Sequence, residues 1–176
     1  MRKLKNEELG RLTADEYKNS SKISVIVVLD NVRSLNNVGS FFRTSDAFSI
    51  EKIILCGITA TPPSKEIHKT ALGAELIVDW SYEKSSLGAV QELKNQGYKL
   101  WAVEQVENSI MLDSFEIQHD TKYALVFGNE VMGVMQEVVD VCDGAIEIPQ
   151  SGTKHSLNVS VSGGVVLWKF FEKLKQ

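Results

Sequence analysis

Short runs of branched and aromatic apolar residues recur along this chain, and polar or amphipathic segments separate them. The run at 23–29 is apolar at nearly every position, which is typical of a strand buried on both faces of a parallel sheet. Runs of the same character follow at 52–56, 75–78, 99–103, 123–127 and 145–148. The pattern therefore predicts six strands.

The segments between these runs carry apolar residues at helical spacing. We predict helices at 38–48, 64–72, 85–96 and 133–141, and a last helix from residue 156 almost to the C-terminus. The last helix has one apolar stripe that we expect to pack on the sheet, formed by Leu157, Val161, Val165, Trp168 and Phe171. Strands that alternate with helices predict an α/β fold, with a mostly parallel sheet and helices on both faces.

We expect one domain at 23–176, preceded by a helical or loosely ordered arm at 1–22. The composition, 43% hydrophobic and 24% charged, is that of an ordinary single domain. The net charge is −4, yet the arm carries six Lys and Arg residues against four Asp and Glu residues. A basic arm on an acidic body is compatible with RNA contact but does not identify the partner.

Membrane and metal sites are not expected. The apolar runs, at about seven residues, are too short to span a bilayer, and no apolar segment of a secretory signal follows the basic N-terminus. We therefore expect a cytoplasmic protein by default. Cys56 and Cys142 lie far apart and the three histidines are scattered, so no metal site is predicted. Both cysteines are expected to be small buried hydrophobes.

Ligands of α/β folds bind beyond the carboxyl ends of the strands, which directs attention to the segments after residues 29, 127 and 148. In the first segment, Asn37 and Arg43 have two interpretations. They are either turn, capping and solvated helix residues, or Arg43 binds a phosphate through both arms of its guanidinium.

The second and third segments carry glycines and small polar residues. Gly128 suits a backbone that approaches a ligand closely or takes a positive φ, while Glu130 could instead cap the following helix. Ser156 is a candidate N-cap of the last helix, and with Asn158 it could also hold a ligand at the helix start. The chain contains no dinucleotide fingerprint, no phosphate-binding P-loop and no nucleophile elbow, which argues against those classes.

Taken in order, the three segments resemble the signature motifs of the SpoU (TrmH) class of SPOUT RNA methyltransferases. The pattern N-x-G-x-x-x-R matches residues 37–43, and the pattern (L/V)-x-G-x-E-x-x-G matches residues 126–133. The pattern I-P-x-x-G-x-x-x-S-L-N-V-S matches residues 148–160 without a gap. The resemblance covers the whole chain except the arm.

This resemblance implies a C-terminal trefoil knot, a homodimer and S-adenosylmethionine bound in the knot. By motif position, the cofactor-binding residues are Val103, Gly128, Ile148 and Leu157. The implied reaction is methyl transfer to a ribose 2′-hydroxyl of RNA, with a catalytic set of Asn37, Arg43, Glu130, Ser156 and Asn158.

In this resemblance Arg43 acts as the base. Because a guanidinium keeps its proton at neutral pH, binding a phosphate and stabilising negative charge are alternative roles for it. The implied site lies at a dimer interface, so Arg43 could serve the partner's cofactor.

Among the members of this class, the chain looks most similar to the tRNA guanosine-18 ribose methylases. The stretches at 148–170 and 97–105 carry that likeness, and the absence of a separate N-terminal RNA-binding domain favours tRNA. Two departures are Gln150, where methionine is common, and Gly163–Gly164, where alanines are common. The alternatives are an rRNA 2′-O-methyltransferase and a non-catalytic RNA-binding protein of the same fold.

Overall fold

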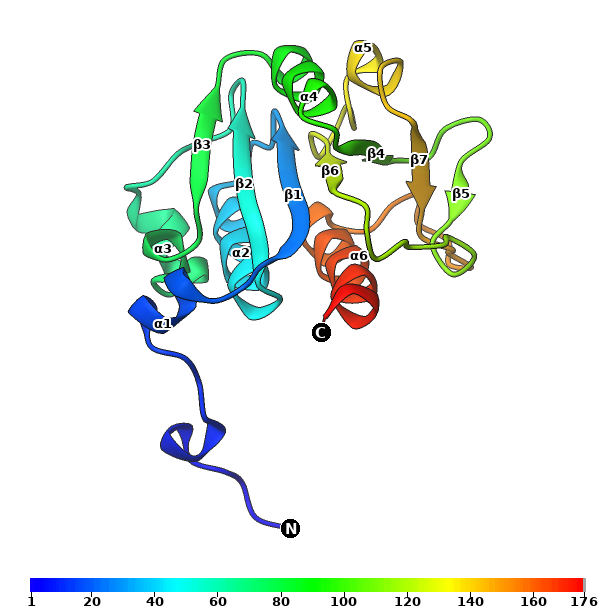
Figure 1. Cartoon of the computed structure of the whole chain (residues 1–176). Coiled ribbons are helices and arrows are strands. Elements are labelled where there is room, and N and C mark those ends of the chain that lie inside the picture. The colour runs from blue at the N-terminus through cyan, green and yellow to red at the C-terminus, as the bar shows by residue number, and fades with distance from the viewer. Residues whose placement is uncertain (176) are drawn as a thin grey trace.

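The computed structural model describes residues 1–175, which contain a seven-stranded, all-parallel sheet in the order β3-β2-β1-β6-β4-β7-β5 (Figure 1). The strands are β1 (Ile23–Asp30), β2 (Ile50–Cys56), β3 (Trp80–Glu83), β4 (Lys99–Val103), β5 (Ile110–Met111), β6 (Tyr123–Phe127) and β7 (Gly144–Glu147). The helices are α1 (Ala14–Asn19), α2 (Leu35–Ala47), α3 (Lys65–Ala71), α4 (Ser86–Asn95), α5 (Gln136–Val139) and α6 (Val159–Leu174), with 3₁₀ turns η1 (Asn6–Leu9) and η2 (Ala74–Leu76).

Strand β1 lies near the centre of the sheet, where both faces are covered. Val27 of β1 pairs in register with Ile53 of β2 on one side and with Leu125 of β6 on the other. All three side chains are fully buried. A continuous β-branched run is favoured here because neither face of the strand meets water.

The core has two layers, one on each face of the sheet. On one face, Phe41 of α2 and Phe170 of α6 pack with the side chains of Val25, Val27 and Leu29. On the other face, Val90 of α4 and Val138 of α5 pack with those of Ile26 and Val28. Each fully buried apolar side chain contributes about 1.5–3 kcal/mol. The predicted α/β fold with helices on both faces is confirmed.

The predicted strand at 75–78 is wrong. Residues 74–76 form the η2 turn, and the strand begins only at Trp80. The reason is Glu75, whose carboxylate is 7% exposed and accepts a hydrogen bond from the backbone N–H of Gly73. His68 lies 2.6 Å from its other oxygen. These bonds fold the chain back on itself and outweigh the β-propensity of the run.

Three helices differ from their predicted bounds. α2 begins at Leu35 rather than residue 38, because the Ser34 side chain accepts a hydrogen bond from Asn37 N and caps the helix. α6 begins at Val159 rather than residue 156, because Asn158 is its N-cap. The helix predicted at 133–141 is only the single turn α5, since Gly133 has a φ of 68°.

The predicted apolar stripe of α6 does not pack on the sheet. The buried positions of this helix are Gly163, Val166, Leu167, Phe170 and Leu174. Four of the five members of the stripe are instead exposed: Leu157 at 40%, Val161 at 52%, Val165 at 41% and Trp168 at 48%. The helix is apolar on nearly every side, so spacing alone selects the wrong face.

The N-terminal arm is fixed to the body at one point. Residues 14–19 form α1, and the Tyr17 side chain is 6% exposed in the core. The Lys22 ammonium lies 4.0 Å from the centre of the Tyr17 ring. The residues before α1 extend away from the body (Figure 1). Within residues 1–175, no helix is both long enough and apolar enough to cross a membrane.

Candidate functional site

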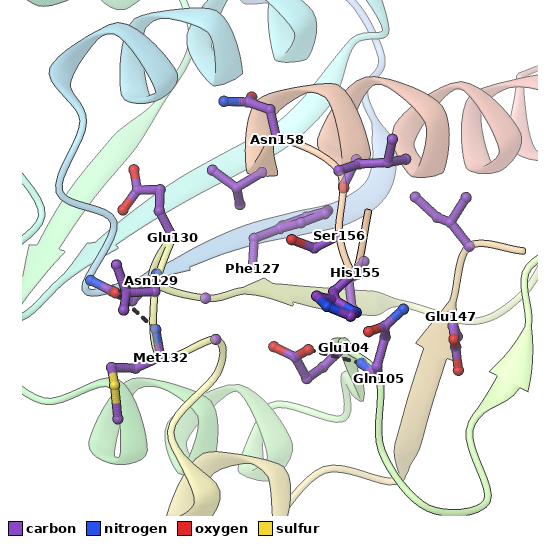
Figure 2. A pocket seen from close by; sticks show the side chains of 18 of the residues that line it. Glu104, Gln105, Phe127, Asn129, Glu130, Met132, Glu147, His155, Ser156 and Asn158 are labelled. Atoms are coloured by element: carbon purple, nitrogen blue, oxygen red, sulfur yellow. Dashed lines mark hydrogen bonds between the residues drawn. The ribbon is translucent and has the colours of Figure 1, made fainter. Parts of the chain in front are cut away.

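A cavity of about 540 Å³ opens beyond the carboxyl ends of β4, β6 and β7 (Figure 2). Its walls come from the loops that follow these three strands and from the first turn of α6. The lining includes three carboxylates and several apolar side chains: Glu104, Glu130, Glu147, Val103, Phe127, Ile146, Ile148 and Leu157. This is the edge of the sheet at which the sequence predicts a ligand.

All four residues predicted to bind a cofactor line this cavity. Val103 ends β4, Gly128 follows β6, Ile148 follows β7, and Leu157 comes just before α6. Four segments distant in the sequence therefore meet at one place.

Gly128 is required for a reason internal to the chain. A Cβ atom at this position would lie 2.1 Å from the carbonyl carbon of Gly133 and from the nitrogen of Val134. The loop after β6 returns over its own first residue, so no larger side chain fits. Gly128 itself has no positive φ in the structure.

Glu130 holds the chain just before α2 and does not cap the helix that follows it in the sequence. Its carboxylate accepts hydrogen bonds from the backbone N–H groups of Arg33 and Ser34, both at 3.0 Å. It also accepts one from the Asn37 side chain at 2.9 Å. Partial burial alone would raise the pKa of Glu130, but these three donors outweigh it and the pKa is lowered. Glu130 is therefore held as a carboxylate.

Asn37 connects the three motif segments. Besides donating to Glu130, its side-chain oxygen accepts hydrogen bonds from Asn158 Nδ2 at 3.2 Å and from Ser160 Oγ at 3.3 Å. Asn37 is 8% exposed and lies in the first turn of α2, not in the preceding loop as predicted. A buried amide with both ends bonded fixes α2, α6 and the loop after β6 relative to one another.

Asn158 and Ser156 lie at the mouth of the cavity. Asn158 caps α6 by accepting hydrogen bonds from Ser160 N and Val161 N, so the alternative of Ser156 as N-cap is wrong. Ser156 lines the cavity and is exposed. In the view of Figure 2, Glu130 and Asn158 lie above the end of β6, and Glu104 lies below it.

Arg43 is apart from this group. It lies on the exposed side of α2 with Asn36 and Ala47, and it is not among the residues that line the cavity. Within residues 1–175 its guanidinium makes no hydrogen bond and no ion pair. The structure therefore brings together Asn37, Glu130, Ser156 and Asn158 but leaves Arg43 outside the cavity of its own chain.

Several lining residues are not among those predicted from the sequence. Glu104 follows β4, and its carboxylate accepts hydrogen bonds from Gln105 N at 2.8 Å and Val134 N at 3.0 Å. Glu147 ends β7 and accepts one from Ser109 Oγ at 2.8 Å. Both are polar residues at the carboxyl end of a predicted strand, and that position was the signal that could have identified them.

In the part of the chain that the structure describes, no His, Cys, Asp or Glu side chains group together as metal ligands would. Cys56 is fully buried as predicted, and burial raises the pKa of its thiol to about 12. Cys142 is only partly buried, and burial raises its pKa to about 11. Both thiols are free, and their raised pKa values favour the protonated form.

Two curated relatives cover most of this chain. A protein of Staphylococcus epidermidis assigned to the TrmH family of tRNA/rRNA methyltransferases is 28% identical over 161 residues, which are 92% of this chain and 64% of the relative. A 23S rRNA (guanosine-2′-O-)-methyltransferase of Nitrosomonas europaea is 32% identical over 154 residues, which are 87% of this chain and 58% of that enzyme. This chain thus spans less than two thirds of the length of either relative.

Solved structures give the same relationship. The TrmH/SpoU tRNA modifying enzyme of A. aeolicus superposes with a TM-score of 0.80 at 25% identity, covering 91% of this chain and 81% of that one. An rRNA methyltransferase of Sinorhizobium meliloti with bound S-adenosylmethionine superposes equally well, with 25% identity and coverage of 91% and 61%. Residues 24–168 match the model of the SpoU rRNA methylase family. The chain therefore belongs to the SpoU rRNA methylase family.

Proposed function

We propose that this protein is an RNA methyltransferase that uses S-adenosylmethionine to methylate a ribose 2′-hydroxyl. The observation that carries this proposal is that the second and third motif segments line one cavity and that Asn37 of the first motif joins them through hydrogen bonds with Glu130 and Asn158. The Nitrosomonas relative, whose name specifies guanosine 2′-O-methylation, supports the same chemistry.

The cavity fits S-adenosylmethionine. Its volume of about 540 Å³ lies within the usual range of small-molecule sites, roughly 300–1,000 Å³. Apolar side chains at Val103, Ile148 and Leu157 suit a purine ring, and the carboxylate of Glu147 suits a positive charge of the ligand. When bound, this cofactor supplies an electrophilic methyl group on a sulfonium. The Sinorhizobium neighbour, which contains this cofactor, supports the assignment.

The residues around the cavity hold the reacting groups in place. Glu130 and Asn37 fix the starts of α2 and α6, so that Asn158 is held at the mouth, and Ser156 lines the cavity two residues before it. A ribose hydroxyl must also lose its proton, and negative charge develops on its oxygen. We assign Arg43 to an RNA phosphate and to that charge, because a guanidinium binds phosphate through two parallel hydrogen bonds.

We further propose that Arg43 serves the cavity of a second copy of the chain. Arg43 lies outside its own cavity, and its guanidinium makes no hydrogen bond or ion pair within residues 1–175. Val161, Val165 and Trp168 give α6 an exposed apolar face that begins next to the cavity, and a partner chain would bury it.

The RNA substrate is proposed to be tRNA, with guanosine 18 of the D-loop favoured. The sequence likeness at 97–105 and 148–170 supports this choice, as does the tRNA modifying enzyme among the structural neighbours. An rRNA substrate is the second candidate, because the Nitrosomonas relative acts on 23S rRNA. The basic arm, with six Lys and Arg residues in 22, would contact the phosphate backbone of either RNA.

The experiment uses purified protein, methyl-labelled S-adenosylmethionine and separate pools of unmodified tRNA and rRNA, followed by nucleoside analysis. We expect 2′-O-methylguanosine from the D-loop of tRNA. Label in rRNA alone would keep the chemistry and overturn the tRNA assignment. Label on a base would overturn ribose methylation. Bound cofactor with no label in either pool would favour the non-catalytic RNA-binding alternative.

A further inference from the structure

Two carboxylates that belong to none of the three motifs accept hydrogen bonds from the far end of the loop that follows β6. Glu104 Oε2 accepts a hydrogen bond from Val134 N at 3.0 Å. Asp30 Oδ2 accepts one from the next residue, Met135 N, at 2.8 Å. Because β1 and β4 are the two neighbours of β6 in the sheet, the carboxylates reach the loop from opposite sides. We call Asp30 and Glu104 the carboxylate clamp.

Burying the carboxylate of Asp30 at this position carries a desolvation cost. It is fully buried, and its other oxygen accepts hydrogen bonds from Ser86 Oγ at 2.6 Å and Asn31 Nδ2 at 2.8 Å. Within residues 1–175 no cationic side chain pairs with it, so neutral donors alone compensate its charge. An apolar residue would avoid that desolvation cost. What Asp30 adds is a fixed acceptor for the N–H of Met135.

The Glu104 side chain is oriented by the backbone of the residue that follows it. Its Oε1 accepts a hydrogen bond from Gln105 N at 2.8 Å, which leaves Oε2 directed at the loop. A Cβ atom on Gly133 would lie 2.2 Å from Oε2, and Gly133 also has a φ of 68°. Gly133, the second glycine of the motif at 126–133, is therefore needed to make room for the Glu104 carboxylate. Gly128, the first glycine, is needed where the loop returns over its own start.

The loop that the clamp holds is a wall of the cavity. Residues 128–133 line it, and Glu104 lines it too. Inside the loop, Asn129 bridges to Gly133 through two backbone hydrogen bonds of 2.9 Å. The Asn129 side chain donates to Asn31 O at 2.8 Å. The wall is thus shaped by its own turn. Asn129 and Glu130 attach its first half to the segment after β1 and to α2, and the clamp attaches its far end.

We propose that Asp30 and Glu104 are positioning residues that hold this wall in its binding shape before any ligand arrives. A preformed wall avoids the ordering cost that a mobile loop would add to binding. The identity of the ligand rests on the proposed function. The clamp itself is formed between residues of the chain alone.

The test combines hydrogen exchange with calorimetry on Glu104→Gln, and Glu107→Gln is the matched control. Glu107 is exposed two residues beyond Gln105 and makes no hydrogen bond within residues 1–175. A glutamine has one acceptor oxygen for the two N–H groups that Glu104 satisfies. We expect exchange protection at Val134 and Met135 in the ligand-free variant to fall roughly tenfold or more. Asp30→Asn provides a second variant acting on Met135 from the other side.

In calorimetry, S-adenosylmethionine and S-adenosylhomocysteine should both bind roughly tenfold more weakly to Glu104→Gln, because the lost wall serves both ligands alike. Weaker binding of the charged ligand alone would mean that Glu104 acts by its charge and would overturn the positioning role. Unchanged protection at Val134 and Met135 in both variants would also overturn it. If the unaltered protein binds neither ligand while the variants lose protection, the clamp stands and the proposed function fails.

Discussion

Glu130 is the residue at which local structure and site chemistry are most closely joined. Its carboxylate accepts hydrogen bonds from the backbone N–H groups of Arg33 and Ser34 just before α2, and the positive end of the helix dipole there favours a negative charge. The same carboxylate holds Asn37, which in turn holds Asn158. Replacing Glu130 should therefore change both the stability of α2 and the position of Asn158 at the mouth of the cavity.

The lowered pKa of Glu130 gives a prediction about acid stability. A carboxylate with a lowered pKa in the folded state stabilises the fold fully above its unfolded value, about 4.3, and loses that contribution as the pH falls through the lowered value. Glu130→Gln should be less stable than the unaltered protein at neutral pH and should show a shallower loss of stability in acid. Thermal unfolding across that range measures both effects.

Glu116→Gln is the control for this measurement, because Glu116 is exposed and makes no hydrogen bond within residues 1–175. It should leave the acid profile unchanged. Identical profiles for Glu130→Gln and the unaltered protein would contradict the role of Glu130 in holding the start of α2.

At the scale of elements, the strands that could be predicted from the sequence are those whose conformation burial alone determines. The runs at 23–29 and 123–127 became β1 and β6 because strands covered on both faces require apolar residues throughout. The run at 75–78 failed because a polar contact, from Glu75 to His68 and Gly73, decided its conformation. The two-residue strand β5 carries too few residues to show a pattern.

The same distinction applies to the site. Motif residues after β6 and β7 line one cavity, and Asn37 of the first motif is hydrogen-bonded to two of them, because the carboxyl ends of parallel strands share an edge of the sheet. The roles of Asp30 and Glu104 depend on which strands flank β6, and that order is set by long-range pairing that no local pattern encodes. The position of Arg43 outside the cavity likewise follows from the face of α2 that the core selects.

The paired glycines of α6 give a prediction for helix packing. A Cβ atom on Gly163 would lie 2.4 Å from the Phe41 ring of α2, whereas one on Gly164 would meet nothing within 4 Å. Gly163→Ala should destabilise the fold by about 1–3 kcal/mol through overpacking. Gly164→Ala should stabilise it by up to about 1 kcal/mol, because alanine is the better helix former. Denaturant unfolding compares the two, and equal effects would contradict the packing of α6 on α2 through Gly163.

At the scale of the whole molecule, the homodimer and the trefoil knot that the resemblance implies stay predictions. The exposed face of α6 makes the dimer testable. Trp168 is 48% exposed and lies 5.7 Å, centre to centre, from the ring of Phe48. Trp168→Lys should shift the protein from dimer to monomer in light scattering, because it places a charge in an interface that must be dry. Lys173→Glu, a charge change at an exposed position of the same helix, is the control. A dimer unaffected by Trp168→Lys would move the interface elsewhere.

The most direct test of the account is subunit complementation between two inactive variants. Arg43→Ala should keep an intact cavity and lose turnover, and Leu157→Asp should lose cofactor binding but keep Arg43. If the cavity of one chain works with Arg43 of the other, a mixed dimer contains one complete site. We expect each variant alone to be inactive and an equal mixture to recover about a quarter of the methyl transfer of the unaltered protein, since half the dimers are mixed and each has one of two sites. A mixture that stays inactive, although light scattering shows mixed dimers and the unaltered protein methylates RNA, would contradict a site shared between two chains.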